Sequence, residues 1–322
     1  MSDLVSIAVP CYNEEQSLPI FLSAISDVVM GWPRDVERPE FEVIALDDGS
    51  SDGTLQIMRW ASGQTWPFAF RYISFSRNFG KEAAMLAGLE AARGAYVCTM
   101  DVDLQDPPSL LPQMYAKLRA GEVDCVATRR VNREGEPPVR SFFARQFYKI
   151  INKISDANIV DGARDYRLMS RQMVDAVISL RERNRFSKGI FGWVGFRTEW
   201  LPYVNVERVA GETHWSFLSL ALYALDGITA FSTAPLAIAS VLGILLCLVA
   251  LVAIIVVIAK TFMFGDPVGG WPSLFCIIVF LGGIQLLCLG ICGQYLAKTY
   301  LEVKNRPVYI VRESFDGEKD ER

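Results

Sequence analysis

The sequence predicts an α/β domain with a mostly parallel sheet, followed by two helices that cross a membrane. Short apolar runs alternate with helical patterns through residues 1–125, which is typical of strands that lie parallel in one sheet. Two later stretches, 227–259 and 267–297, contain no Asp, Glu, Lys or Arg. A chain of 322 residues exceeds what one core usually needs, which leaves room for both parts.

Each predicted strand is a short apolar run, and a helical pattern follows within a few residues. Asn13 stands where it could cap the first helix, and Ser51 or Asp52 could cap the second. Asp106 is followed by two prolines, and this pattern predicts that Asp106 caps the start of the fourth helix and has no chemical role. The expected strands are Val5–Val9, Glu42–Leu46, Arg71–Ser74 and Ala95–Met100, and the expected helices are Glu15–Met30, Ser51–Ala61, Lys81–Ala92 and Ser109–Ala120.

The two uncharged stretches predict membrane-spanning helices at about 235–259 and 271–297. Each exceeds the roughly 20 residues that cross the hydrocarbon core, whereas buried helices of soluble proteins rarely stay uncharged over this length. Basic residues gather after the second stretch, which places that flank, and with it the N-terminal domain, in the cytoplasm. These residues are Lys298, Lys304, Arg306 and Arg312.

An amphipathic pattern at about 140–154 adds a third membrane-directed segment. Phenylalanine and isoleucine share one side of the helical wheel and basic residues share the other, which is typical of an interfacial helix. An ordinary surface helix packed on the domain is the alternative. The expected organisation is a cytoplasmic domain over 1–232, two membrane helices within 233–297, and a cytoplasmic tail over 298–322 whose acidic end from Asp316 is disordered.

Composition excludes several classes of function. The net charge of −4 gives no basic footprint for nucleic acid. Seven cysteines without zinc-like spacing fit unpaired thiols in a reducing compartment, and the first residues lack the pattern of a cleaved signal peptide. The one histidine, His214, nearly excludes mechanisms that need a histidine base or several histidine ligands. No glycine-rich dinucleotide motif follows the first strand, and no P-loop motif occurs.

Polar side chains follow each of the four predicted strands. In a parallel sheet, ligands bind outside the carboxyl ends of the strands, so these groups would meet at one edge. Solubility alone does not explain four such clusters. The clusters are Tyr12-Asn13-Glu14, Asp47-Asp48, Ser76-Arg77-Asn78 and Asp101-Val102-Asp103.

The cluster after the fourth strand predicts a metal site. Asp101 and Asp103 flank Val102, and alternation along a strand end would put both carboxylates on one side. Hard oxygen ligands suit Mg²⁺ or Mn²⁺, which commonly take one or two carboxylates together with substrate phosphates. Gln105 supplies a third oxygen, so a metal and diphosphate site is favoured over a solvated turn. The paired acids Asp47-Asp48 would accept hydrogen bonds from a nucleobase or from ribose hydroxyls.

Five motifs occur in an order that resembles the family-2 glycosyltransferases: PCYNEE, LDDGSSDGT, SFSRNFGKEAA, MDVDLQDPP and DYRLMSR. More narrowly, the chain resembles the polyprenyl-phosphate sugar transferases, which include bactoprenol glucosyltransferases and dolichol-phosphate mannose synthases. The resemblance covers roughly residues 3–312, and the combination of motifs is far more specific than any one of them. The QxxRW signature of processive synthases is absent, which argues against a polymerising enzyme.

The resemblance implies a GT-A fold, a nucleotide-sugar donor and a metal held by the DxD motif. Asp165 would be the acid near the acceptor phosphate, and Arg130 would face phosphate. By motif position, the donor site would contain Pro10, Tyr12, Glu14, Asp47, Asp48, Asp101, Val102, Asp103, Arg133 and Arg208, and the metal ligands would be Asp101, Asp103 and Gln105.

The segment around Asp165 departs from the family pattern. Arg164 stands where relatives often have glycine, which leaves open whether Asp165 or Asp161 is the functional acid. An ion pair of Asp165 with Arg164 or Arg167 is the structural alternative to a catalytic role. His214 stands in a position where relatives usually place a basic residue, and it could still donate to a phosphate, although a structural role is favoured for a lone histidine.

The implied activity is inverting transfer of a hexose, with UDP-glucose as the expected donor, to undecaprenyl or another polyprenyl phosphate at the cytoplasmic face of the inner membrane. Because the second pKa of such a phosphate is about 6, Asp165 is expected to position groups more than to remove a proton. GDP-mannose or another UDP-sugar is the alternative donor, and a non-catalytic membrane scaffold is the alternative function. Glycines in the second apolar stretch would allow a homo-oligomer, although the sequence leaves this open.

Overall fold

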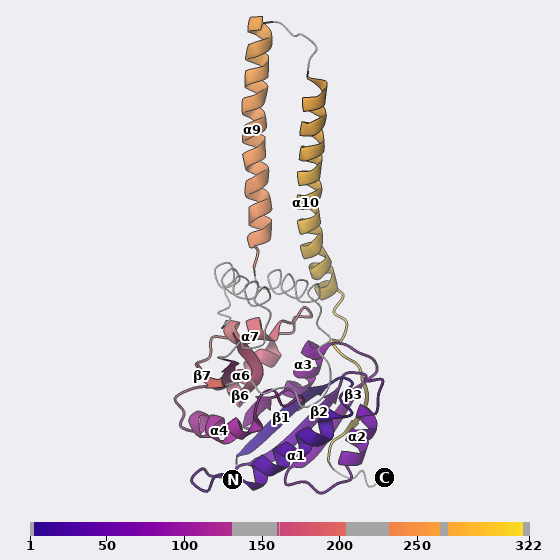
Figure 1. Cartoon of the computed structure of the whole chain (residues 1–322), viewed down its shortest axis with the longest axis vertical. Coiled ribbons are helices and arrows are strands. Elements are labelled where there is room, and N and C mark those ends of the chain that lie inside the picture. The colour runs from indigo at the N-terminus through magenta and orange to yellow at the C-terminus, as the bar shows by residue number, and fades with distance from the viewer. Residues whose placement is uncertain (1–2, 131–159, 161, 204–231, 265–269, 318–322) are drawn as a thin grey trace. The chain divides into compact units, whose positions relative to one another are not determined.

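The computed structural model describes residues 3–130, 160, 162–203, 232–264 and 270–317 of the chain (Figure 1). Clustering of contacts divides the chain into two compact units. The first contains residues 1–227 and 307–322 and holds the α/β sheet, and the second contains residues 228–306 and holds two long helices. The predicted interfacial helix at about 140–154 lies outside the described residues.

The described strands form one sheet in the first unit. They are β1 (Leu4–Cys11), β2 (Glu40–Asp47), β3 (Ala69–Phe75), β4 (Tyr96–Thr99), β5 (Cys125–Arg130), β6 (Ala163–Ser170), β7 (Thr198–Tyr203) and β8 (Val311–Phe315). Their order in the sheet is β7-β5-β6-β4-β1-β2-β3-β8. Only β6 and β8, among these described strands, run antiparallel to their neighbours. The predicted α/β class with a mostly parallel sheet is confirmed.

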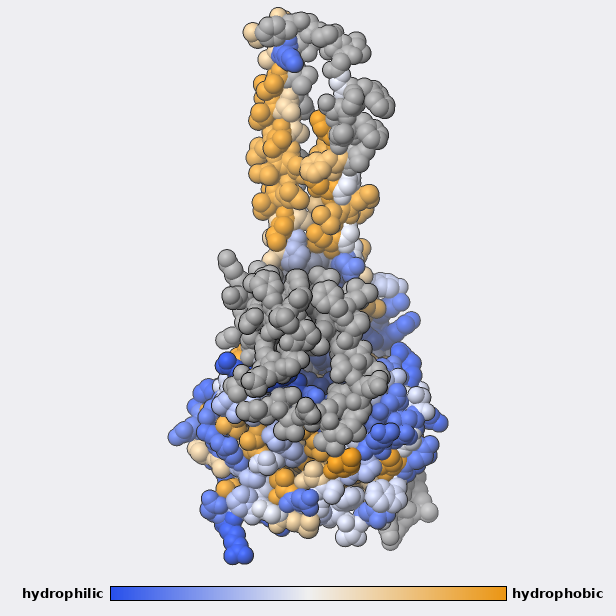
Figure 2. Space-filling view, viewed as in Figure 1, coloured by the Kyte–Doolittle hydropathy of each residue, from blue (hydrophilic) through white to orange (hydrophobic). Residues whose placement is uncertain are grey.

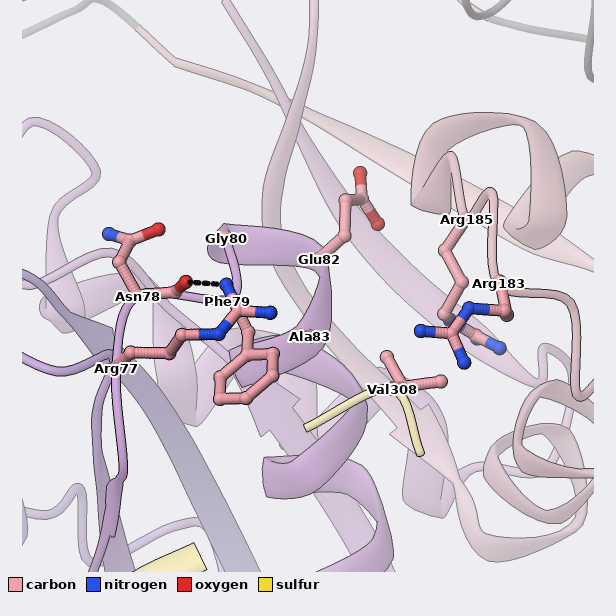
Figure 3. Close-up of a pocket in the computed structure, with 9 residues that line it drawn as sticks. All are labelled: Arg77, Asn78, Phe79, Gly80, Glu82, Ala83, Arg183, Arg185 and Val308. Atoms are coloured by element: carbon pink, nitrogen blue, oxygen red, sulfur yellow. Dashed lines mark hydrogen bonds between the residues drawn. The ribbon is translucent and has the colours of Figure 1, made fainter. Parts of the chain in front are cut away.

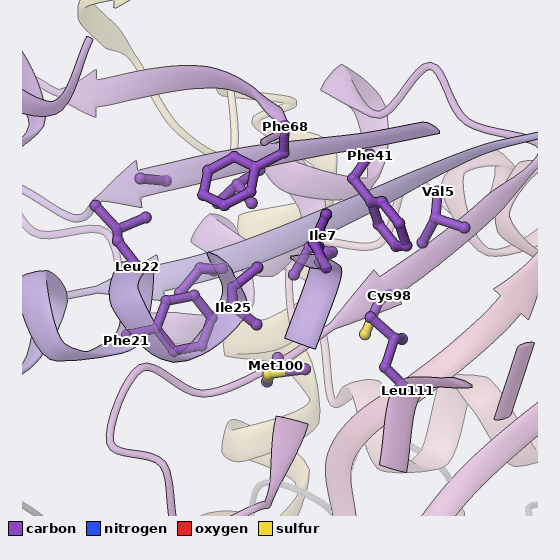
Figure 4. Packing of buried hydrophobic residues seen from close by; sticks show 14 of the residues in the cluster. Val5, Ile7, Phe21, Leu22, Ile25, Phe41, Phe68, Cys98, Met100 and Leu111 are labelled. Atoms are coloured by element: carbon purple, nitrogen blue, oxygen red, sulfur yellow. The ribbon is translucent and has the colours of Figure 1, made fainter. Parts of the chain in front are cut away.

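Helices pack on both faces of the sheet. Val5 and Ile7 of β1 lie in one hydrophobic cluster with α1 (Figure 4). Ala8 and Leu46 point instead to α3 on the opposite face, as alternation along a strand requires. Gly88 permits this close packing, because a Cβ there would lie 2.7 Å from the Cβ of Ala8. The helices of this unit are α1 (Ser17–Met30), α2 (Thr54–Ala61), α3 (Lys81–Ala91), the 3-10 helix η1 (Pro108–Leu110), α4 (Leu111–Arg119), α6 (Arg171–Ser179) and α7 (Ser187–Trp193).

The first four strands and helices agree with the predicted ranges to within a few residues, but the predicted cap of the first helix is wrong. The helix α1 begins at Ser17, so Asn13 is too far away to cap it. Instead, Asn13 Oδ1 accepts a hydrogen bond from the N–H of Ser51 at 2.9 Å. The cap position of α2 is Gly53 and not Ser51 or Asp52, although Asp52 Oδ1 accepts from the N–H of Thr54, the first residue of α2, at 3.0 Å.

The end of the chain belongs to the sheet, which the sequence did not predict. β8 pairs with β3, and the ring of Phe315 stacks on that of Tyr72 with centroids 6.0 Å apart. Asp316 was expected to be disordered, yet its carboxylate lies 2.6 Å from the guanidinium of Arg71. The separate tail predicted over 298–322 is therefore corrected: α10 extends into it, and residues from 307 onward belong to the first unit.

The second unit contains the helices α9 (Ala234–Phe264) and α10 (Trp271–Val303), which cover both predicted spans. Both are long and apolar enough to cross a membrane. Their apolar side chains are largely uncovered, with Leu248 57% and Leu286 71% exposed, and Figure 2 shows hydrophobic residues over most of the described helix surface in view. Within this unit, the hydroxyl of Tyr295 on α10 donates to the carbonyl of Ser232, just before α9, at 2.6 Å.

Candidate functional site

The carboxyl ends of four parallel strands meet at one edge of the sheet, where the sequence predicted that polar groups converge. Cys11 of β1 lies opposite Asp47 of β2, and Asp47 lies opposite Ser74 of β3. The N–H of Met100, directly after β4, donates to the carbonyl of Ala8 at 3.1 Å. The loops after all four strands therefore begin side by side, and the predicted convergence is confirmed.

Asp47 and Asp48 fasten this edge together. The Asp47 carboxylate accepts from the hydroxyl of Ser74 at 2.6 Å. The Asp48 carboxylate accepts from the N–H groups of Phe79 at 2.6 Å and Gly80 at 2.9 Å. Both acids are buried, and burial raises the pKa of Asp48 above its ordinary value. The predicted acceptors for a nucleoside are thus engaged with the protein's own loops.

The loop after β1 is tied to the loop after β2. The hydrogen bond from Ser51 to Asn13 joins them, and Asn13 adopts a φ of 56°, in the left-handed region that asparagine tolerates. This bond holds the predicted donor residues of the first loop in place. Of these residues, Pro10 and Glu14 are half-buried and Tyr12 is exposed.

The predicted metal-binding acids lie in a turn directly after β4. The side chain of Asp101 is 26% exposed, whereas Asp103 is buried and Val102 packs in the hydrophobic core. A turn, and not alternation along a strand, therefore sets the directions of the two carboxylates. Gln105 Oε1 accepts from the guanidinium of Arg164 at 3.0 Å, so the oxygen predicted as a third ligand is engaged.

Lys81, the first residue of α3, links the predicted metal site to the predicted acceptor acid. Its ammonium nitrogen lies 2.7 Å from Asp101 Oδ1 and 2.6 Å from Asp165 Oδ2. Burial alone would lower the pKa of Lys81, but the two carboxylates raise it above its ordinary value. A cation in the first turn opposes the helix dipole, so the two acids, and not the helix, account for its place.

Asp165 lies on β6, which runs antiparallel to β4 and brings this acid beside the turn after β4. Burial acts to raise its pKa, but the charges of Lys81, Lys188 and Arg167 outweigh burial and hold the pKa well below its usual range. The carboxylate therefore stays ionised at neutral pH and is a weak proton acceptor. Its ion pair is with Lys81, and not with Arg164 or Arg167, the two partners that the sequence offered.

Asp106 is not a helix cap, contrary to the sequence-based prediction. The 3-10 helix η1 begins at Pro108 without a side-chain cap. Asp106 is 1% exposed, and its Oδ1 accepts from Arg164 Nε at 3.2 Å and from the hydroxyl of Tyr203. Burial raises the pKa of this carboxyl, which the charge of Arg164 opposes. Through Asp106, Arg164 thus holds the turn after β4 to β6, and Tyr203 holds it to β7.

The predicted phosphate-binding arginines are described only in part. Arg130 ends β5 and is half-buried, and its N–H donates to the carbonyl of Gly162 at 3.1 Å. The other predicted residues lie outside the described part of the chain. These are Arg133, Asp161, Arg208 and His214.

Sequence reasoning missed two residues of α3 that shape the site. Lys81 joins the two acids, and the Glu82 carboxylate accepts from the N–H of Ser187 at 3.0 Å, which fixes α3 to the start of α7. The available signal was a lysine in the first turn of a helix that starts at an edge rich in acids. The Ser187 contact has no such signal, because 105 positions separate the two residues.

Comparison with known proteins identifies the family. The profile described as "Glycosyl transferase family 2" matches residues 6–178. The SfII prophage-derived bactoprenol glucosyl transferase of Shigella flexneri is 40% identical over 313 residues, which cover 97% of this chain and 99% of that relative. The prophage bactoprenol glucosyl transferase homolog of Escherichia coli (strain K12) is 40% identical, covering 96% of this chain and 98% of its own.

A Bacillus subtilis (strain 168) relative, the putative glycosyltransferase CsbB, is also 40% identical, over 98% of this chain and 94% of its own. The sheet, with acids after β2 and β4 at its carboxyl edge, is the GT-A-like arrangement that the motifs implied. With a profile match over more than half its length and these near full-length relatives, the chain belongs to glycosyl transferase family 2.

Proposed function

We propose that this chain transfers glucose from UDP-glucose to a polyprenyl phosphate, which makes a lipid-linked monosaccharide. The chain of ion pairs from Asp101 through Lys81 to Asp165 carries the proposal, because it joins the acids predicted for the donor and for the acceptor. Relatives that match nearly the whole chain are named bactoprenol glucosyl transferases, which supports both the sugar and the lipid.

A divalent cation, Mg²⁺ or Mn²⁺, fits the turn after β4. The ammonium of Lys81 already lies beside the Asp101 carboxylate there, which supports the view that this position attracts a positive charge. Asp101 and Asp103 would hold the ion, whereas Gln105 would first have to release Arg164. The described residues contain no group of three or more His, Cys, Asp or Glu side chains suited to a metal, which fits a site completed by substrate phosphates. The ion would neutralise the charge that develops on the leaving diphosphate.

The donor nucleotide would occupy the edge formed by the loops after β1 and β2. Asp47 and Asp48 support this edge by holding its loops, since their carboxylates accept hydrogen bonds from Ser74, Phe79 and Gly80. The residues that border solvent there would contact the nucleoside, and three arginines would face the diphosphate. The first group is Pro10, Tyr12 and Glu14, and the second is Arg130, Arg133 and Arg208.

The transfer needs no strong base. A lipid phosphate oxygen attacks the sugar C1 while the bond from C1 to the nucleoside diphosphate breaks, so the configuration inverts in a single displacement. The acceptor is largely anionic already, because its second pKa is about 6. Asp165, held ionised, would orient the sugar or the acceptor, and Lys81 offsets a negative charge that would otherwise repel the phosphate.

The apolar helices would anchor the enzyme in the cytoplasmic membrane as a multi-pass protein. Both ends of the α9–α10 pair lead into the same compact unit, since residues before 228 and after 306 belong to it. The two helices would therefore enter and leave the membrane on one side, and the basic flank after α10 favours the cytoplasm for that side and for both termini. The segment at about 140–154 would lie in the interface, and exposed helix faces leave room for a homo-oligomer.

A transfer assay with the purified full chain tests the proposal. The protein is incubated with undecaprenyl phosphate, Mg²⁺ or Mn²⁺, and labelled UDP-glucose, UDP-galactose or GDP-mannose in turn. The expected result is a lipid-linked glucose with the opposite anomeric configuration to the donor, which EDTA abolishes. Absence of a labelled lipid with every donor would overturn the proposal. A product from GDP-mannose alone would show that the transferred sugar is mannose and not glucose.

A further inference from the structure

A polar cavity adjoins the site described above at the start of α3, where the N–H groups of Phe79 and Gly80 donate to Asp48. Its volume is about 340 Å³, and it opens between the start of α3, the segment joining α6 to α7, and the residues before β8 (Figure 3). Its charged lining residues are three arginines, Arg77, Arg183 and Arg185, and one acid, Glu82. None of the residues proposed for the donor, the metal or the acceptor lines it.

Arg185 is buried here without a carboxylate partner among the described residues. It is 8% exposed, and within the described ranges it donates to main-chain carbonyls, those of Leu180 and, at 3.4 Å, Val177. Its Nε is buried and meets no acceptor in the described part of the chain. Burial lowers the pKa of Arg185, and the charges of Glu82, Glu182 and Glu90 oppose that shift. A buried charge without a close ion-pair partner is costly, and an anion in the cavity would relieve that cost.

The other two arginines lie on opposite walls. Arg77 sits over the ring of Phe79, 4.1 Å from the centroid, and donates to the carbonyl of Asn78 at 2.9 Å. Arg183 donates to the carbonyl of Pro307 at 3.3 Å. Figure 3 shows Arg77 on one side of the cavity and both Arg183 and Arg185 on the other. An anion between the walls would meet guanidinium groups from both sides.

The start of α3 adds a further positive field. The helix begins after Gly80, which has a φ of 97° and no side chain to cap the first turn. A Cβ at Gly80 would meet nothing within 4 Å, so the backbone there borders open space. The N–H groups at the start of a helix favour negative charge, and here that of Gly80 already donates to Asp48 and that of Ala83 to the carbonyl of Gly80. The opposing acid, Glu82, is occupied by the N–H and hydroxyl of Ser187.

We propose that this cavity binds a phosphate group, at a site separate from the one that holds the donor diphosphate. The ligand is a phosphate monoester or inorganic phosphate, because guanidinium groups recognise its oxygens and the start of a helix favours its charge. The phosphate comes either from a lipid headgroup or from free solution. An alkyl chain on the phosphate should strengthen binding in the first case and leave it unchanged in the second.

Titration of the full chain in detergent, with EDTA and without any sugar donor, tests this site independently of transfer. Isothermal calorimetry measures binding of inorganic phosphate in one arm and of decyl phosphate in the other. We expect saturable binding of at least one probe. Arg77→Gln and Arg183→Gln should each weaken it about tenfold, since each removes a charge-assisted hydrogen bond. Tighter binding of decyl phosphate identifies a lipid headgroup, and equal binding identifies free phosphate.

Two further variants separate this site from general charge effects. Arg34→Gln removes an exposed positive charge outside the cavity and should leave phosphate binding unchanged. Glu82→Gln removes the one acid of the lining and should tighten binding, which a purely structural role for Glu82 does not predict. The proposal is overturned if neither probe binds, if Arg77→Gln and Arg183→Gln both bind like the wild type, or if Arg34→Gln weakens binding equally.

Discussion

Replacing Lys81 with methionine should make the protein bind Mn²⁺ more tightly when no donor is present. The ammonium of Lys81 lies 2.7 Å from Asp101 Oδ1, one of the two carboxylates proposed to hold the metal. The cation of the protein and the metal therefore compete for the same oxygen. Methionine keeps the length and the apolar stem of the side chain but removes the charge, so the carboxylate is released to the metal.

The size of the effect follows from the exposure of the ion pair. The side chain of Lys81 is 43% exposed and that of Asp101 is 26% exposed, so solvent screens their attraction. Ion pairs of this kind contribute about 0.2–1 kcal/mol. If the free energy of the Lys81–Asp101 ion pair no longer has to be lost when the metal binds, the dissociation constant for Mn²⁺ should fall by up to about fivefold.

Electron paramagnetic resonance of free Mn²⁺ measures this affinity directly. Lys117→Met is a matched control. Lys117 is 34% exposed and its ammonium lies 2.7 Å from the Glu199 carboxylate, and neither residue belongs to the proposed site. The control should bind Mn²⁺ like the wild type. If Lys81→Met binds the metal equally or more weakly while its unfolding temperature is unchanged, Lys81 does not compete for Asp101.

Three further predictions concern the acid of β6 and the packing of the domain. Asp165→Asn should lower kcat about 100-fold at every pH. The fall of the rate at acid pH should remain near the acceptor pKa of about 6, because the low pKa of Asp165 keeps this carboxylate ionised above and below that pH. If the variant no longer shows this fall, Asp165 is instead a carboxylate base. Arg71→Ala should lower the free energy of unfolding by about 3 kcal/mol, since it leaves the buried Glu42 without its 2.8 Å partner, and urea unfolding followed by tryptophan fluorescence should show a clearly lower midpoint. Gly88→Ala should cost about 1–3 kcal/mol in the same measurement, because its new methyl would lie 2.7 Å from the Ala8 side chain, and an unchanged midpoint would contradict the close packing of α3 on β1.

The sequence predicted the first half of the sheet well because its signals are local. The four strands from β1 to β4 are apolar runs bounded by polar turns, and their helices follow at short intervals. β6 was missed because its charged motif, with Asp165 and Arg167, reads as a catalytic segment and not as a strand. β8 was missed because its partner strand lies more than 200 positions earlier, where Tyr72 meets Phe315.

The candidate site was likewise predictable in part: the positions of its acids were, and their contacts were not. Acids at the ends of β2 and β4 were predictable, because parallel strands bring their carboxyl ends to one edge. What each acid contacts was not predictable from the sequence, since Asp106 pairs with Arg164 and Asp165 pairs with Lys81 across long separations. The low pKa of Asp165 likewise depends on charges that only the folded chain assembles.

The central claim is that the edge joined by Asp101, Lys81 and Asp165 is where glucose is transferred. The most direct measurement compares initial rates of lipid-linked glucose formation for the wild type, Asp101→Asn, and Asp27→Asn as a control on the exposed side of α1. With UDP-glucose, undecaprenyl phosphate and Mn²⁺, the account predicts wild-type rates for Asp27→Asn and a loss of at least about 100-fold for Asp101→Asn. Equal rates for all three proteins would contradict it.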